Sequence, residues 1–240
     1  MRQLKKILLF LYSVYALMVF WVFMIILLPA ILLPSFISLR ASVISFAAVR
    51  LWAYIFTFLT GVRVKFTGKE NLQKDKAHIL VSNHTSFLDV VSLVMLFNRP
   101  IRPLGKVELL KIPVFGWIVS RLTVVVDRSS RESRNKSVER LVELTRNSIS
   151  ILIFPEGTMN RTSSPLLRFH SGAFRIAQES KVPIIPIAIA NAGNLLPPRG
   201  FKMRPGTIRV SIGKELDPDK MSAGQMSDTS YRWIKEQLGH

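Results

Sequence analysis

The stretch "ILVSNHTSFLDVVSLVMLF", residues 79–97, combines a strand pattern, a turn and a helix pattern. Its first four residues form a short apolar run typical of a buried strand, and the apolar run from residue 87 is long enough for a buried helix. Ser86, followed three positions later by Asp89, matches a capping box, which predicts that the helix begins at Ser86. The stretch therefore predicts a strand–turn–helix unit with His84 in the turn.

This unit can bring a histidine and an aspartate together. On one regular helix, residues five positions apart point about 140° away from each other, so His84 and Asp89 would not meet. If the helix begins at Ser86, His84 lies outside it and Asp89 can lean back from the first turn. A histidine with one nitrogen held by a carboxylate has a fixed tautomer, and its other nitrogen is free to act as a base. The alternative is that Asp89 only caps the helix and His84 is an ordinary turn residue.

Similar apolar runs recur along the rest of the chain and alternate with helix patterns. Helical spacing of apolar residues is found in residues 131–147, 172–180 and 231–238. Strands alternating with helices predict an α/β domain with a mixed sheet flanked by helices. The further strand candidates are "LTVVVDR" (residues 122–128), "ISILIFP" (149–155), "VPIIPIAIA" (182–190) and "GTIRVSIG" (206–213).

The N-terminal 62 residues differ from the rest of the chain, because they contain five basic residues and no acidic one. A helix over residues 7–28 would be about 33 Å long, enough to cross a bilayer core of about 30 Å, and Pro29 and Pro34 should then break it. This apolar run is too long for the core of a secretory signal peptide. The second apolar segment, residues 41–62, carries Arg50 and suits a helix lying in the membrane interface.

These two segments predict a membrane-embedded helical hairpin over residues 1–62, followed by a separate globular domain over residues 63–240. Basic residues precede the first helix and follow the second, whereas the turn between them holds only Arg40. The positive-inside tendency therefore places both outer ends on the cytoplasmic side. The hairpin either spans the membrane twice or dips in and returns, and the sequence leaves both open.

The overall composition narrows the class of partner. The formal net charge of +18 favours an anionic partner, while a hydrophobic fraction of 49% argues for a membrane and against a simple nucleic-acid binder. The chain has no cysteine, which excludes disulfides, thiolate metal sites and a cysteine-linked intermediate. The histidines outside the turn, His78, His170 and His240, are scattered, so we expect no metal site.

Two further stretches contain polar residues that could serve a site. In "LIFPEGTMNR", residues 152–161, a strand runs into a turn where Glu156 needs a partner, Gly157 permits close backbone approach and Thr158 offers a hydroxyl. The alternative is an ordinary turn. In residues 105–128, Lys106 and Arg128 bracket an apolar segment and could hold a phosphate, although a single lysine is more often ordinary surface charge.

The order of these stretches resembles the glycerolipid acyltransferase family. An HxxxxD motif is followed by a basic GKxEL…DR segment, by FPEGT and by VPIIPI, and "GKENL" at residues 68–72 resembles the start of the same domain. The resemblance covers about residues 63 to 215. Within this family, the chain most resembles the 1-acylglycerol-3-phosphate acyltransferases. The resemblance implies the glycerol-3-phosphate acyltransferase-like fold.

The resemblance implies direct transfer of a fatty acyl chain from acyl-CoA or acyl carrier protein to the sn-2 hydroxyl of lysophosphatidic acid, giving phosphatidic acid. It implies His84 as general base and Asp89 as the residue that orients it. The expected oxyanion donors are backbone N–H groups at the start of the Ser86 helix. No cofactor is implied. The membrane would be the inner membrane if the protein is bacterial, with the catalytic domain on its cytoplasmic face.

The resemblance also assigns residues to the acceptor. Glu156, Gly157 and Thr158 would hold its glycerol-phosphate part, and Lys106 and Arg128 would lie near its phosphate.

Two departures from the family pattern leave the acceptor headgroup open. Met159 stands where the family often has arginine, and Arg161, two positions on, is a candidate replacement. His170 and Ser171 stand where lysines are common before Gly-Ala, and Arg168 and Arg175 could compensate for them. The acceptor could therefore be another lysolipid.

Two other function classes stay open. One is a lipid hydrolase with Ser86 as nucleophile, and the other is a non-catalytic membrane-binding protein.

Overall fold

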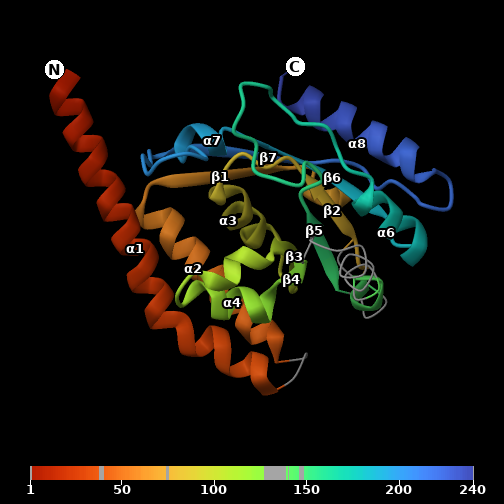
Figure 1. Ribbon diagram of the computed structural model, residues 1–240, viewed down its shortest axis with the longest axis horizontal. Coiled ribbons are helices and arrows are strands. Elements are labelled where there is room, and N and C mark those ends of the chain that lie inside the picture. Colours follow the sequence, from red (N-terminus) through yellow and green to blue (C-terminus); the bar gives the residue numbers. More distant parts are fainter. Residues whose placement is uncertain are drawn as a thin grey trace.

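The computed structural model describes residues 2–37, 41–73, 76–126, 139, 141–145 and 149–239. Its described strands form one seven-stranded sheet in the order β1-β7-β6-β2-β5-β3-β4 (Figure 1). Only β6 and β7 pair antiparallel, and the other neighbours pair parallel, which confirms the predicted mixed sheet. The strands are β1 Val62–Thr67, β2 Ile79–Ser82, β3 Ile101–Lys106, β4 Val124–Val126, β5 Ser150–Ile153, β6 Ile184–Ala190 and β7 Gly206–Ile212.

Helices cover both faces of this sheet. The core on one face includes residues of α1, α2 and α3, and the core on the other includes residues of α6 and α8. Strand β2 serves both cores, because Leu80 belongs to the first while Ile79 and Val81 belong to the second. The helices are α1 Arg2–Ile37, α2 Ser42–Leu59, η1 Lys69–Asn71, α3 Phe87–Leu96, η2 Val107–Lys111, α4 Phe115–Leu122, α6 Gly172–Ser180, α7 Ala192–Leu195 and α8 Ala223–Gln237.

The strands predicted from apolar runs are confirmed as β2 and, with shorter bounds, as β4, β5, β6 and β7. Two strands were not predicted. Strand β1 lies where the second membrane segment was expected to end, and β3 contains Arg102, Pro103 and Gly105, which obscure a strand pattern. Arg102 is nevertheless buried, and its guanidinium donates a hydrogen bond to the Arg121 carbonyl at 2.8 Å. Of the helix predicted over residues 131–147, the structure describes only residues 139 and 141–145, which are helical.

The expectation that Pro29 and Pro34 break the first helix is wrong. Helix α1 runs through both prolines and curves along its length (Figure 1). A proline inside a helix removes one hydrogen bond and clashes with the preceding turn, at a cost of about 3 kcal/mol. Packing offsets this cost, because Ile31, which lies between the prolines, is completely buried.

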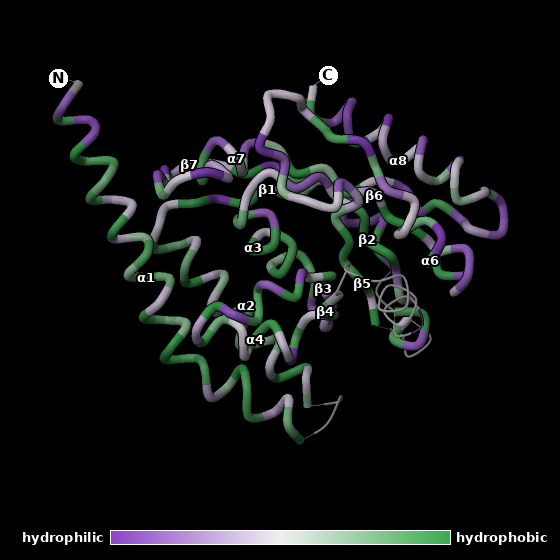
Figure 2. The backbone as a smooth tube through the Cα atoms, in the orientation of Figure 1, coloured by the Kyte–Doolittle hydropathy of each residue, from purple (hydrophilic) through white to green (hydrophobic). Residues whose placement is uncertain are grey.

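The helical hairpin packs against the α/β layers rather than standing apart from them. Trp52 and Phe56 of α2 are buried in the same core as Leu88 and Val91 of α3, and Ser13 Oγ of α1 accepts a hydrogen bond from the Met203 N–H at 3.0 Å. Both helices expose large apolar side chains, and Figure 2 shows that most of their length is hydrophobic. By length and composition, α1 and α2 are each able to cross a membrane. The division at residue 62 into two domains stays a prediction.

The buried His78, just before β2, predicts a pH dependence of stability. Its Nε2 lies 3.4 Å from Glu215 Oε2. Burial lowers the pKa of His78, Glu215 acts against this shift, and Lys76 adds to it. Below a pH of about 6.5 the unfolded chain binds a proton that the folded protein resists, so stability falls as the pH falls until the lowered pKa is reached.

We therefore expect Tm to fall by a few degrees more between pH 7.5 and 5.5 in the wild type than in His78→Gln. Thermal unfolding in detergent at both pH values measures the difference. Equal shifts in the two proteins would contradict it.

Candidate active site

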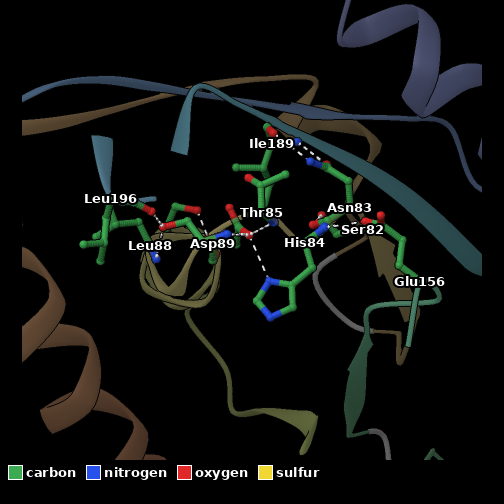
Figure 3. A network of polar contacts seen from close by, with 11 residues as sticks. Ser82, Asn83, His84, Thr85, Leu88, Asp89, Glu156, Ile189 and Leu196 are labelled. Atoms are coloured by element: carbon green, nitrogen blue, oxygen red, sulfur yellow. Dashed lines mark hydrogen bonds and ion pairs between the residues drawn. The ribbon is translucent and has the colours of Figure 1, made fainter. Parts of the chain in front are cut away.

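The turn between β2 and α3 has the predicted cap. The Leu88 N–H donates to Ser86 Oγ at 3.2 Å, and the Ser86 N–H donates to Asp89 Oδ2 at 2.8 Å (Figure 3). Ser86 Oγ also donates to the Leu196 carbonyl at 2.7 Å. The Ser86 hydroxyl is thus completely buried and committed to two hydrogen bonds.

The cap brings His84 and Asp89 into contact, as the sequence predicted. His84 Nδ1 lies 2.9 Å from Asp89 Oδ2, which also accepts the Thr85 N–H at 2.7 Å. Two backbone N–H groups, from Thr85 and Ser86, can only donate, so this oxygen is an acceptor and Nδ1 carries the hydrogen. In the neutral imidazole, Nε2 is then the nitrogen without a hydrogen, on a side chain that is 17% exposed. The arrangement supplies a base with a fixed tautomer.

The segment after β5 holds His84 from the other side. The His84 N–H donates to Glu156 Oε1 at 2.7 Å, and the His84 carbonyl accepts the Asn160 N–H at 2.7 Å. The imidazole stacks on Phe154 with ring centroids 4.0 Å apart. Both the backbone and the ring of His84 are therefore positioned by residues 154–160. No sequence pattern indicates these roles of Phe154 and Asn160.

Glu156 lies behind the His84 turn. It is 3% exposed, and its second oxygen, Oε2, accepts the Leu167 N–H at 2.9 Å. Burial raises the pKa of this carboxyl, while the hydrogen bonds from Leu167 and His84 act in the opposite direction. Both oxygens of Glu156 thus accept backbone N–H groups. The contact with the acceptor that the resemblance implies stays a prediction.

Asn83 attaches the same turn to the neighbouring strand β6. Its side-chain amide donates to the Ile189 carbonyl at 2.9 Å and accepts the Ile189 N–H at 2.8 Å. A side-chain amide carries an NH₂ donor group beside a carbonyl acceptor, so it can pair with a backbone amide as a strand would. The sequence signal for this role is an asparagine directly after the buried strand and directly before His84.

The remaining predicted site residues lie around this centre. Gly157 has φ 71°, in the left-handed region that glycine favours, and its N–H donates to the Phe154 carbonyl at 3.0 Å. Thr158 and Arg161 are exposed beyond it, and Lys106 is exposed at the end of β3. Strands β2, β5 and β3 are parallel neighbours, so these residues follow the same edge of the sheet as His84. Arg128 lies outside the described residues.

An apolar pocket of about 300 Å³ opens beside the turn. Phe87, the first residue of α3, and Met159 line it together with side chains of α1 and of the segment after α7. Met159, which stands where the family often has arginine, is thus part of the apolar wall of this pocket. The other lining residues include Phe20, Trp21, Leu196 and Phe201.

No group of three or more His, Cys, Asp or Glu side chains that could hold a metal ion occurs among the described residues.

We expect Glu156→Gln to lower kcat about 10- to 100-fold without unfolding the protein. Glutamine keeps one acceptor oxygen, so either the His84 N–H or the Leu167 N–H is left facing an NH₂ group, and an unsatisfied buried donor costs about 1–3 kcal/mol. Steady-state kinetics and Tm measure the two effects. Glu179→Gln on the exposed face of α6 is the matched control. A Glu156→Gln protein with wild-type kcat would contradict the positioning role.

Comparisons with known proteins agree with the geometry. A family model described as Acyltransferase matches residues 63–190. The chain is 30% identical over 199 residues to the 1-acyl-sn-glycerol-3-phosphate acyltransferase of Pseudomonas aeruginosa, covering 79% of this chain and 76% of that protein. It is 29% identical over 192 residues to the protein of the same name from Saccharomyces cerevisiae, covering 79% and 63%. A relative from Chlamydomonas reinhardtii is 33% identical over 180 residues, covering 73% and 53%.

The chain thus spans about half to two thirds of the length of the Chlamydomonas reinhardtii and Saccharomyces cerevisiae relatives. Among solved structures, it resembles the crystal structure of the 1-acyl-sn-glycerophosphate (LPA) acyltransferase PlsC from Thermotoga maritima, with a TM-score of 0.82. That match covers 100% of this chain and 97% of the other at 24% identity. It supports the fold alone.

Proposed function

The chain belongs to the acyltransferase family, and from that premise we propose that it acylates the sn-2 hydroxyl of 1-acylglycerol-3-phosphate to give phosphatidic acid. The observation that carries the proposal is the His84–Asp89 pair, which holds the hydrogen of the neutral imidazole on Nδ1 and leaves Nε2 to act as the base at the strand edge. The names of the relatives from Pseudomonas aeruginosa and Saccharomyces cerevisiae support the acceptor. The product is a phospholipid precursor, so the role is in phospholipid synthesis.

In the proposed mechanism, His84 Nε2 removes the proton from the acceptor hydroxyl as the hydroxyl oxygen attacks the thioester carbonyl carbon. The tetrahedral intermediate then collapses, the carbon–sulfur bond breaks, and the imidazolium returns the proton to the departing thiolate. The Asp89 carboxylate stabilises the imidazolium between these steps. A positioned base contributes about 10²–10⁴-fold to the rate. No acyl-enzyme, metal or cofactor takes part.

The oxyanion needs a donor, and most N–H groups at the start of α3 are engaged. Asp89 accepts the Thr85 and Ser86 N–H groups, and Ser86 accepts those of Leu88 and Asp89. Within the described part of the chain, the Phe87 N–H has no such partner. The sequence predicts that N–H groups at the start of the Ser86 helix donate to the oxyanion. Of these groups, we assign the Phe87 N–H to this role.

The apolar pocket supports a lipid substrate beside His84. We propose that the pocket receives an acyl chain. Phe87 follows the His84 turn and Met159 follows the Glu156 turn, so the pocket lies beside both turns. Side chains of α1 also line it and connect it to the membrane hairpin. Lys106 and Arg161 are the exposed cations proposed to meet the acceptor phosphate, together with Arg128. Gly157 and Thr158 stay proposed contacts of the glycerol-phosphate part. The thioester donor is acyl-CoA or acyl carrier protein.

We expect Met159→Arg to raise KM for long-chain lysophosphatidic acid about tenfold, because a guanidinium in an apolar wall is costly to desolvate. KM for a short-chain acceptor should change less, and Met159→Leu should behave as the wild type. Measuring KM for both acceptors in the three proteins checks this. A lower KM for lysophosphatidic acid in Met159→Arg would instead indicate that residue 159 faces the phosphate.

The two apolar N-terminal helices attach the protein to a membrane. We propose that the hairpin enters one leaflet and returns, because α2 packs along α3 and a full span would carry α3 and the sheet into the bilayer. The cytoplasmic face is proposed from the basic residues on either side of the hairpin.

An acceptor panel tests the proposed activity. Purified protein receives acyl-CoA or acyl carrier protein thioesters together with labelled lysophosphatidic acid or other lysolipids, and products are separated by chromatography. We expect phosphatidic acid as the main product. A faster reaction with another lysolipid would move the assignment to that acceptor. A lack of acylated product with every combination would overturn it.

A hydrolase using Ser86 is disfavoured, because the Ser86 hydroxyl donates to the Leu196 carbonyl and is completely buried.

A further inference from the structure

The segment between β3 and β4 exposes apolar side chains. In the sequence it lies far from the N-terminal hairpin. It comprises η2 and α4. Four of its large apolar residues are between 38% and 60% exposed, and Trp117 is the most exposed of them. Single exposed apolar residues are common, but a cluster on one short segment marks a contact surface. The four residues are Val107, Leu110, Ile112 and Trp117.

The backbone of this segment is tightly specified. Val114 has φ 64°, which is strained for a β-branched residue, and the Phe115 N–H donates to the Pro113 carbonyl at 2.6 Å. A Cβ on Gly116 would meet the Leu110 carbonyl oxygen at 2.2 Å, so only glycine fits there. The outward apolar side chains are therefore presented by a defined turn, at a cost in strain that a contact function explains.

This surface continues the apolar outer face of the hairpin. The Arg121 guanidinium lies 3.9 Å from the ring centroid of Phe36, in the last turn of α1. Trp117 lies four residues before Arg121 in α4, and thus on the same side of that helix. Phe36 and Ile37 are themselves largely exposed. Figures 1 and 2 show α4 beside the C-terminal half of α1, with apolar residues on both.

Basic side chains flank the cluster. Lys106, Lys111 and Arg121 are exposed, and Glu108 is the one acid between residues 106 and 122, so the segment carries a net charge of +2. Lysine and arginine beside apolar residues can reach lipid phosphates while their carbon chains stay in the apolar layer. Tryptophan is enriched at the same depth of a bilayer.

We propose that η2 and α4 form a second membrane-contact element, with Trp117 and Ile112 in the interface of an anionic bilayer and Lys111 at its phosphates. The proposal rests on the membrane attachment of the hairpin in the proposed function. Its contact reaches the active-site helix, because Phe115 at the start of α4 packs against Phe87 at the start of α3, with ring centroids 6.0 Å apart. The element thus holds the His84 edge of the sheet toward the bilayer.

The absence of cysteine makes the depth of residue 117 directly measurable. Trp117→Cys in the full chain carries a spin label, the protein is placed in vesicles containing anionic phospholipid, and accessibility to oxygen and to an aqueous nickel complex is measured. We expect the label at 117 to be accessible to oxygen and shielded from nickel. Glu179→Cys on α6, labelled in the same way, should be accessible to nickel.

Equal nickel accessibility at both positions would overturn the proposal. Shielding at 117 that persists in detergent and brings spin–spin broadening would also overturn it, because it would indicate a second copy of the chain as the occupant. These readouts do not depend on activity, so they separate this proposal from the proposed reaction.

A kinetic test uses Trp117→Glu and Trp117→Phe. For lysophosphatidic acid embedded in vesicles, we expect Trp117→Glu to raise KM about tenfold with kcat little changed, and Trp117→Phe to behave as the wild type. For a short-chain acceptor below its micellar concentration, all three proteins should agree. A fall in kcat that is equal for both acceptors would overturn the membrane role.

Discussion

Replacing His84 by alanine is expected to abolish acyl transfer, with kcat lowered by about 10²–10⁴-fold or more, while membrane association persists. The reason lies in the Asp89 contact, which keeps the hydrogen on Nδ1 and leaves Nε2 to take the acceptor's proton. Alanine removes this nitrogen but keeps the backbone N–H that Glu156 accepts and the carbonyl that Asn160 reaches. The turn should therefore stay folded.

Acceptor-dependent product formation, Tm and sedimentation with vesicles measure these three properties in the same His84→Ala preparation. His170→Ala is the matched control, because His170 is exposed and lies outside the β2–α3 turn. Near wild-type transfer by a folded His84→Ala protein would exclude His84 as the base.

Asp89→Asn is expected to lower kcat by about 10- to 100-fold with little change in Tm. An asparagine oxygen can still accept the Thr85 and Ser86 N–H groups, so the cap survives. What is lost is the negative charge beside the imidazolium, and a hydrogen bond to a charged group is worth about 1.5–3 kcal/mol. The second oxygen, Oδ1, is buried without a partner among the described residues, so an NH₂ group in its place breaks no bond.

Asp89→Ala should behave differently. It leaves two buried backbone N–H groups and the His84 Nδ1–H without an acceptor, at about 1–3 kcal/mol each, so Tm should fall clearly as well. The kcat values of the two variants report how Asp89 orients His84, and their Tm values report how Asp89 caps the helix. If Asp89→Asn kept full activity, Asp89 would be a cap and nothing more.

The sequence predicts the part of the candidate site that depends on neighbouring residues, namely the His84–Asp89 pair. A capping box has a fixed geometry, so the position of Ser86 determined where the helix begins and hence that His84 and Asp89 could meet. Glu156, Asn83 and Phe154, by contrast, contact residues that lie far from them in the chain. No local pattern encodes which backbone group a buried carboxylate or amide will face.

The same limit explains the fold. Continuous apolar runs revealed β2, β5 and β6, because parallel strands buried on both faces need them. Strand β3 was missed because buried Arg102 and Pro103 interrupt the run, and α1 was predicted too short because tertiary packing around Ile31 outweighs the local effect of two prolines. Both errors arise where packing against another element overrides local preference.

Thiol release from the acyl donor, measured with and without lysophosphatidic acid, tests direct transfer most directly. With the wild-type protein we expect thiol release only when the acceptor is present, with one phosphatidic acid formed for each thiol, and none of this with His84→Ala. Release at the same rate without acceptor would contradict direct transfer and indicate a hydrolase. No release with any donor would contradict catalysis and leave a membrane-binding role.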